Sequence, residues 1–240
     1  MRKTMTLSLD KQNAYRARYA QMRPGWQPAT TVYEALILDR FQPGMRVVDL
    51  GCGRGGALEQ VGETMSGALG LDPDIASLKE HRMPGLRRAA AAAEALPLPD
   101  ACIHLVFSSW VLEHLPDPSR AFREVSRILV AGGAFIFVTP GGHSPPALVN
   151  RALRPFQARL VPLMYGRDAT DAFPMVYRAN ARRRIEALAR ESGLRLVRLD
   201  HIEDPTYFAF HPALFRINVA LVRTLPHAMA EHLVGVCVKN

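Results

Sequence analysis

Short apolar segments alternate with amphipathic segments along most of this 240-residue chain. Short runs rich in Val, Ile and Leu predict buried strands, whereas apolar residues that recur every three or four positions predict helices. Strands are predicted at 46–50, 67–71, 87–91, 103–107, 134–138, 194–199 and 233–238. This alternation favours a mostly parallel sheet that is covered by helices on both faces.

Helices are predicted between these strands and ahead of the first one. Two N-terminal helices, 10–22 and 29–41, are separated by Pro24, Gly25 and Pro28. Later helices are predicted at 55–63, 74–81, 118–129, 179–192 and 212–225. The last of them is strongly apolar, so we expect it either to pack against the sheet or to contact a membrane surface.

Residues 140–176 interrupt the regular pattern. Prolines, among them Pro140, Pro145, Pro146 and Pro155, and a mixture of apolar and basic residues in this stretch indicate a lid or an insertion after the fifth strand. Because no repeat or long linker divides the chain, we predict one domain over 1–240. Its parts are an N-terminal helical cap (1–42), a central core (43–140), the insertion (141–176) and the C-terminal part of the sheet (177–240).

The chain is basic, with 30 Lys and Arg residues against 22 Asp and Glu residues and a net charge of +8. Such a charge suits an anionic small molecule, an anionic lipid surface or nucleic acid. Nucleic acid is the least favoured partner, because no aromatic residues interleave the densest arginine stretch to stack on bases. That stretch contains Arg178, Arg182, Arg183, Arg184, Arg190, Arg195 and Arg198.

Two further features of the sequence concern location and metals. No apolar run approaches the ~18 residues that span a bilayer. The N-terminal residues also lack the apolar core of a signal peptide, so we expect a cytoplasmic protein. Cys52, Cys102 and Cys237 are far apart, and no Cys/His cluster has metal-ligand spacing, so no metal site is predicted.

The segment 47–56 reads Val-Val-Asp-Leu-Gly-Cys-Gly-Arg-Gly-Gly and carries most of the chemistry. Its glycines let a strand turn sharply into a helix and bring backbone N–H groups close to a ligand. The spacing Gly51-x-Gly53-x-x-Gly56 matches the dinucleotide fingerprint. However, the carboxylate of Asp49 at the strand tip would repel a pyrophosphate and would suit a ligand with a cationic amino group.

With four later segments, this run resembles the class I S-adenosylmethionine (SAM)-dependent methyltransferases, and among them the subgroup that includes the ubiquinone and menaquinone methyltransferases. The resemblance covers roughly residues 30–140. It implies SAM as cofactor and a Rossmann-like, doubly wound α/β sheet of seven strands in the order 3-2-1-4-5-7-6, with the last strand antiparallel. The later segments are Leu69–Asp72, Ala93–Asp100, Val106–Leu115 and Phe122–Leu129, the last leading into Gly132-Gly133.

The resemblance also implies which residues bind the cofactor. In the glycine loop these are Asp49, Gly51, Cys52 and Gly53, and at the ribose they are Asp72 and Pro73. Ala93 and Glu94 would contact the adenine, and Ser108 and Ser109 would lie beside the sulfonium. Tyr19 of the N-terminal cap would also contact the cofactor. The chain departs from the family at Ala92, where relatives carry an aspartate that contacts the adenine amino group. Glu94, the backbone or water would then make this contact.

On the acceptor side, His114 and His143 are the candidate catalytic residues, because a histidine with a pKa near neutrality can take a proton from a hydroxyl group. Each is alternatively a structural residue of its motif. Trp110 either forms a wall of the cofactor or acceptor pocket, with a cation–π contact to the sulfonium, or packs in the core. His201, His211, His227 and His232 have no motif context, and we expect them to be surface or packing residues.

These observations predict a SAM-dependent methyltransferase for a small-molecule or glycolipid/saccharide-type acceptor, with transfer to oxygen. Methyl transfer from a sulfonium is an in-line displacement, so the protein mainly supplies proximity and alignment. One alternative, suggested by Ala92, is a module that binds SAM without transferring methyl. Another is an NAD(P)-binding oxidoreductase, suggested by the glycine spacing and by Asp72. Peripheral membrane contact is compatible with a lipid-linked acceptor.

Overall fold

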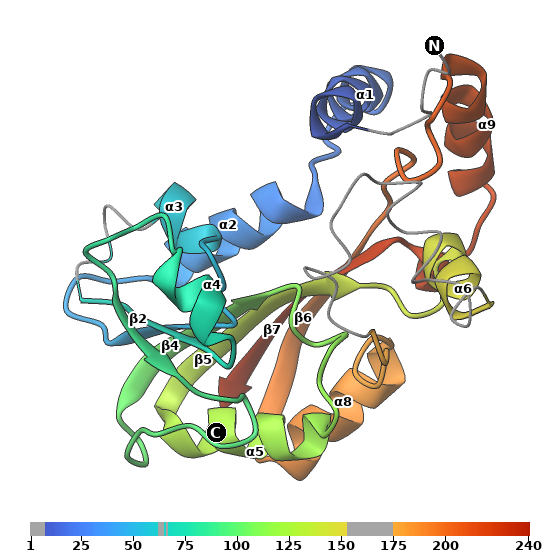
Figure 1. Cartoon of the computed structure of the whole chain (residues 1–240). Coiled ribbons are helices and arrows are strands. Elements are labelled where there is room, and N and C mark those ends of the chain that lie inside the picture. The colour runs from blue at the N-terminus through green and yellow to red at the C-terminus, as the bar shows by residue number, and fades with distance from the viewer. Residues whose placement is uncertain (1–7, 62–64, 66, 153–174) are drawn as a thin grey trace.

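A computed structural model describes residues 8–61, 65, 67–152 and 175–240. Among these residues seven strands form one sheet in the order β3-β2-β1-β4-β5-β7-β6 (Figure 1). Strands β1 to β5 are parallel, and β7 runs antiparallel to both β5 and β6. The predicted order and the antiparallel last strand are therefore confirmed. The strands are β1 (Val47–Leu50), β2 (Leu69–Asp72), β3 (Arg87–Ala90), β4 (Ile103–Ser109), β5 (Leu129–Pro140), β6 (Leu194–Ile202) and β7 (His232–Lys239).

Helices cover both faces of the sheet, as the alternating pattern predicts (Figure 1). One apolar cluster joins the sheet to α5 and α8 through residues such as Phe122 and Ile185, and the other joins it to α2 and α3 through Tyr33 and Leu58. The helices are α1 (Leu9–Met22), α2 (Ala29–Arg40), α3 (Ala57–Val61), α4 (Ile75–Lys79), α5 (Pro118–Ile128), α6 (Pro145–Ala152), α8 (Arg182–Glu191), α9 (Pro212–Val222) and the 3₁₀ turn η4 (His227–Met229).

Two element boundaries near β5 differ from the prediction. β5 starts at Leu129, directly after α5, and not at residue 134. The pairing of β4 with β5 shifts register between Ile103 and Leu105, which allows the strand to begin early. Helix α6 lies within the predicted insertion and starts at Pro145, in the first turn where proline is tolerated. The rest of the predicted lid, residues 153–174, falls outside the described residues.

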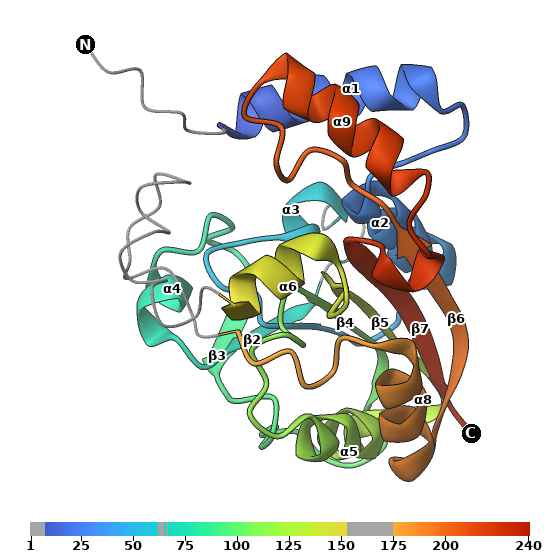
Figure 2. The ribbon, with the colours of Figure 1, turned by 90° about the vertical axis from the view of Figure 1, so that its right-hand side faces the viewer.

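The N-terminal cap consists of two helices with different positions. α2 packs on the sheet, whereas α1 pairs with α9 in a separate layer (Figure 2). A third apolar cluster holds this α1–α9 pair together through Tyr15, Tyr19, Ala209, Phe215 and Val219. The expectation that the apolar segment 212–225 packs against the sheet is therefore wrong, because its buried side chains meet α1.

α9 leaves three large apolar side chains exposed, those of Leu214, Ile217 and Leu221. Contact of this face with a membrane surface stays a prediction. Within the described ranges, no helix is long and apolar enough to span a membrane.

Candidate functional site

The glycine loop follows β1 at the carboxyl edge of the parallel strands. Gly51 has a φ of +79°, and a Cβ at this position would lie 2.2 Å from Cγ2 of Val111. Only glycine fits this conformation and this close approach. The N–H groups of Gly51 and Cys52 both donate to the carbonyl of Leu71, at 2.7 and 3.2 Å. These bonds fix the loop to the end of β2.

Asp72 ends β2 and holds the same loop from the other side. Its Oδ2 accepts a hydrogen bond from the Gly53 N–H at 2.9 Å, and its Oδ1 accepts one from the Asp74 N–H at 2.8 Å. Each carboxylate oxygen keeps a second lone pair for another donor. Pro73, between the two aspartates, is exposed. The position fits two neighbouring hydroxyl groups, and the ribose role of Asp72 and Pro73 stays a prediction.

Asp49 lies in the middle of the edge, between β2 and β4. The side chain is 1% exposed, and neither carboxylate oxygen has a hydrogen-bond partner among the described residues. Burial first, and then the charge of Asp72, raise the pKa of Asp49 to about 7. A buried carboxylate without donors is unfavourable in a folded protein. This arrangement therefore calls for a ligand that brings its own donors or a positive charge.

Two hydroxyl groups near Asp49 are in the same situation. Tyr33 of α2 and Ser108 of β4 are buried, and neither hydroxyl has a partner within the described part of the chain. Burial and then the charge of Asp49 hold the pKa of Tyr33 well above its usual range, so its hydroxyl keeps the proton. Tyr33 was not predicted as a site residue, because the sequence does not distinguish an aromatic residue on the apolar face of a helix from any other core residue.

Other predicted cofactor residues act through packing or backbone. The Cys52 thiol faces Gly70, where an added Cβ would lie 2.8 Å from its Sγ. Burial raises the pKa of this thiol to about 12, so Cys52 is a small packing group. Ala93 is part of the core, and Oε1 of Glu94 accepts a hydrogen bond from the Asp117 N–H at 3.4 Å. Ala92 is exposed.

Residues 109–111 lie over the glycine loop. Oγ of Ser109 lies 3.5 Å from the position of a Cβ on Gly56, and Val111 contacts Gly51. Trp110 has a φ of +58°, and its N–H donates to the carbonyl of Val138 at 3.0 Å. Its ring packs against the core cluster of Tyr33 and is only partly buried. Trp110 therefore combines core packing with a position at the site.

A buried polar group lies beside the candidate base His114. Glu113 is 2% exposed, and its Oε2 accepts a hydrogen bond from the Thr139 hydroxyl at 3.1 Å. Nδ2 of Asn180 donates to Thr139 Oγ1 at 2.6 Å. Burial raises the pKa of Glu113 to about 7. Nε2 of His114 lies 3.8 Å from Oε1 of Glu113. His143 is exposed on the turn after β5.

The catalytic roles of His114 and His143 stay predictions. Glu113 belongs to the same sequence motif as His114 and was not assigned a role from sequence, although a titratable group buried beside a strand end is a candidate base in its own right.

The structure does not bring Tyr19 to the glycine loop. Tyr19 is fully buried in the cluster of α1 and α9, where its hydroxyl donates to Oε1 of Glu203 at 3.3 Å. Arg23 also bonds to both groups, and the ring of Trp26 packs edge-on against Tyr19. Of the two N-terminal helices, α2 packs on the sheet, so Tyr33 takes the position near Asp49. A cofactor contact of Tyr19 stays a prediction that this geometry does not support.

No group of three His, Cys, Asp or Glu side chains in the described ranges has a geometry that would hold a metal ion. Beside the glycine loop at this edge of the sheet, the hydroxyls of Tyr33 and Ser108 and the carboxylate of Asp49 have no hydrogen-bond partners among the described residues.

Comparison with known proteins places this site in a family context. Residues 48–137 match the family described as "Methyltransferase domain". The chain is 30% identical over 165 residues to a malonyl-[acyl-carrier protein] O-methyltransferase of Methylococcus capsulatus, covering 66% of this chain and 54% of the relative. It is 27% identical to a demethylmenaquinone methyltransferase of Renibacterium salmoninarum, over 63% of this chain and 65% of the relative.

A solved structure has the same fold. The S-adenosylmethionine-dependent methyltransferase of Mesorhizobium loti aligns with a TM-score of 0.57 and 21% identity, over 88% of this chain and 98% of that one. The present chain spans about half the length of the curated relatives that it matches. The segment 48–137, which matches the methyltransferase family, contains the glycine loop, Asp72, the 93–100 loop and residues 108–114.

Proposed function

We propose that this chain, which belongs to the class I SAM-dependent methyltransferases, transfers the SAM methyl group to an oxygen atom of a small-molecule acceptor. The observation that carries the proposal is Asp49, a buried carboxylate without donors at the centre of the carboxyl edge. Bound SAM supplies an activated methyl group on a sulfonium. The cationic amino group of SAM matches the negative charge of Asp49, and its N–H groups match the two carboxylate oxygens, which accept no other hydrogen bond among the described residues.

The neighbouring residues fit the rest of the same cofactor. Asp72 has free lone pairs for the ribose hydroxyls, beside the loop that it already holds through Gly53. The 93–100 loop is fixed for the adenine side by α5: Glu124 accepts from the Leu96 N–H at 2.8 Å, and Arg127 donates to the Leu96 carbonyl at 2.9 Å. Because the side chain of Ala92 cannot contact the adenine amino group, we infer that the backbone of this loop makes that contact.

The remaining task of the protein is to place the acceptor in line with the methyl group and to exclude water. Proximity and alignment lower such barriers by ~7–11 kcal/mol in favourable cases. Transfer to a hydroxyl needs a group that removes its proton. Glu113, with a pKa raised to about 7 by burial, and the adjacent His114 support that role at the end of β4. The O-methyltransferase among the relatives supports oxygen as the target.

The test is methyl transfer from radiolabelled SAM to matched panels of small hydroxyl, amine and carbon-acid acceptors. We expect turnover on hydroxyl acceptors and its loss in Glu113→Gln. Turnover on amines or carbon acids alone would contradict transfer to oxygen. Binding of SAM without turnover on any panel would favour a module that only binds the cofactor, and binding of NADH in place of SAM would contradict the proposal altogether.

A further inference from the structure

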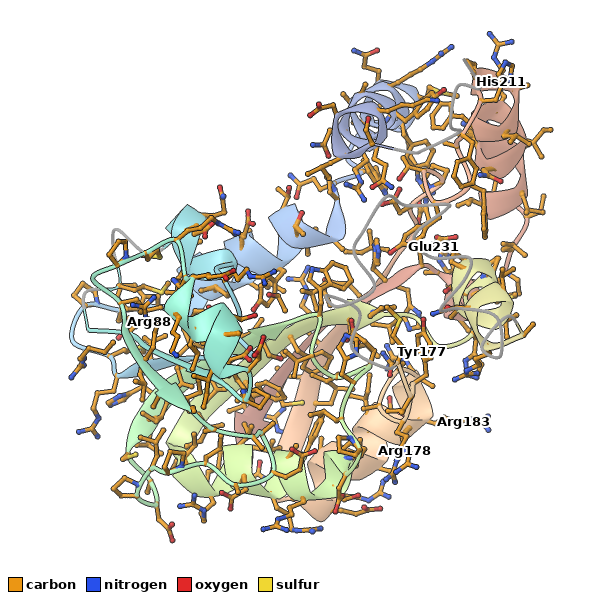
Figure 3. The ribbon with its side chains drawn as sticks, in the orientation of Figure 1. Arg88, Tyr177, Arg178, Arg183, His211 and Glu231 are labelled. Carbon is orange, nitrogen blue, oxygen red and sulfur yellow. The ribbon has the colours of Figure 1, made fainter. Side chains whose placement is uncertain are left out.

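A histidine from the far end of the chain lies at the same edge of the sheet. His232 opens β7, where it pairs with Pro140 of β5 and Ile202 of β6. It is 4% exposed, and its neighbour Glu231 lies where the sheet meets the α1–α9 layer (Figure 3). The segment after β6 brings the Tyr207 hydroxyl to 2.8 Å from Nε2 of His232.

Aromatic contacts connect His232 with the glycine loop. The Trp110 ring meets the imidazole edge-on, with 5.0 Å between ring centroids, and the Tyr207 ring lies 5.5 Å from it. Trp110 stands between Ser109, which faces Gly56, and Val111, which contacts Gly51. His232 thus contacts the segment 109–111, which covers the glycine loop, through the ring of Trp110.

The hydrogen bonding of His232 is incomplete. Its Nδ1 is buried and has no partner among the described residues. The Tyr207 hydroxyl has no other hydrogen-bond partner within the described residues, and burial keeps its pKa well above its usual range. We therefore take this hydroxyl as the donor and Nε2 as the acceptor, because the phenol hydrogen would otherwise lack an acceptor. In a neutral imidazole whose Nε2 accepts, Nδ1 carries the hydrogen. His232 therefore presents a buried N–H donor without an acceptor, an arrangement that calls for a ligand.

The surrounding charges keep this imidazole neutral. Burial lowers the pKa of His232 to about 4, against the opposing effect of Asp204. Arg16 of α1 bonds to Asp204 through Nε and Nη2 at 2.9 and 2.8 Å, which offsets the carboxylate charge. The side chain of Glu231 accepts from the Asp204 N–H at 2.8 Å and is therefore engaged elsewhere.

We propose that His232, held by Tyr207, is an acceptor-binding residue whose Nδ1–H donates to an oxygen atom of a planar acceptor beside Trp110. The inference rests on the proposed function. The rings of Trp110 and Tyr207 both pack against the imidazole. An acceptor at Nδ1 would therefore lie beside aromatic side chains, which favours a flat molecule, and the unpaired donor selects one that carries a hydroxyl, enolate or carbonyl oxygen.

The experiment uses 4-nitrocatechol as the probe, titrated into the full chain loaded with S-adenosylhomocysteine (SAH). His232→Asn keeps a donor near the position of Nδ1, whereas His232→Gln keeps only a partner for Tyr207. We expect His232→Gln to weaken probe binding about 10- to 100-fold, the usual effect of losing a buried hydrogen bond. His232→Asn should stay much closer to the wild type, and His227→Gln, an exposed control, should bind equally well.

A second readout needs no variant. In ¹⁵N imidazole spectra of the wild type, we expect a protonated Nδ1 that does not titrate between about pH 5.5 and 8 and that shifts when the probe is added. The proposal is overturned if the wild type does not bind the probe, if His232→Gln binds it as well as the wild type, or if His232 titrates near its ordinary pKa. If the wild type does not bind SAH, the result would instead contradict the proposed function.

Discussion

The buried carboxylate of Asp49 favours binding of a cationic ligand but destabilises the ligand-free fold. Its pKa in the folded, ligand-free chain is raised to about 7, compared with about 3.9 in an unfolded chain. The folded state therefore binds this proton more tightly. The destabilising contribution of Asp49 is therefore absent below about pH 4, grows as the pH rises towards 7, and is complete above it.

Replacing Asp49 with Asn removes this penalty while it removes the charge that a cationic ligand needs. We expect Asp49→Asn to raise the melting temperature of the ligand-free protein at pH 8, with a gain of up to about 4 kcal/mol. At pH 4 the gain should fall below about 1 kcal/mol. Thermal unfolding of both proteins across this range measures the difference, and equal melting temperatures at pH 8 would show that Asp49 is not a buried, unpaired charge.

Gly51 allows a prediction about the loop itself. Gly51→Ala would place a Cβ 2.2 Å from Val111 in a left-handed conformation, so the loop has to move. We expect SAH affinity to decrease more than 10-fold, as titration calorimetry would measure. Gly85→Ala is the matched control, because a Cβ there meets no atom within 4 Å and its φ is not left-handed. Equal losses in both variants would argue against a specific role for Gly51.

Residues at strand ends were more predictable than residues that cover them. Asp49, Gly51 and Asp72 are fixed by a motif whose spacing sets the strand, the turn and the next strand. Tyr33 and Tyr19 could not be told apart, since both are aromatic residues in N-terminal helices. Which of them approaches Asp49 depends on which helix packs on the sheet. That packing is set by tertiary contacts, and no local sequence pattern indicates it.

At the level of elements, helix α5 holds the 93–100 loop. Arg127 donates to the carbonyls of Leu96 and Leu98 at 2.9 and 2.7 Å and pairs with Glu124 and Asp100. One arginine thus joins the last turn of a helix to a loop that carries no regular structure.

We expect Arg127→Ala to release this loop and to lower SAH affinity several-fold, because the loop has to be ordered again on binding. Arg123→Ala, an exposed position on the same helix, is the control. Calorimetric titration at constant temperature compares the two. If Arg127→Ala binds SAH as the wild type does, the loop does not contribute to the cofactor site.

Element types were predictable where the hydrophobic period was clear, and boundaries were not. The amphipathic pattern of α5 and its start at Asp117 and Pro118 are local features. In contrast, β5 starts five residues earlier than expected because Leu129 pairs with Ile103 across a register shift. The surface on which α9 packs is provided by α1. The pattern of apolar residues within α9 does not distinguish packing against a helix from packing against a sheet.

On the scale of the whole molecule, the apolar core of the sheet is distinct from the apolar core of the α1–α9 pair. The sheet and its helices hold the glycine loop, whereas the α1–α9 pair has its own cluster centred on Phe215 and Tyr15, whose rings stack at 4.5 Å. The segment that joins β6 to α9 carries Asp204 and Tyr207, so the position of this pair affects the region around His232.

Phe215→Ala should therefore separate acceptor binding from cofactor binding. We expect it to destabilise the α1–α9 pair by ~3–5 kcal/mol and to raise the KM for the acceptor, with SAH affinity unchanged. Leu214→Ala, on the exposed face of the same helix, should change neither quantity. Steady-state kinetics with a hydroxyl acceptor and SAH titration test this, and a parallel loss of both affinities would mean that the two cores are one cooperative unit.

Calorimetric titration of SAH into the wild type and Asp49→Asn at pH 8 tests the role of the buried carboxylate. We expect tight binding by the wild type and loss of binding in Asp49→Asn, although the variant is expected to be the more stable protein. Binding of SAH to Asp49→Asn with wild-type affinity would contradict the claim that this buried carboxylate holds the amino group of the cofactor.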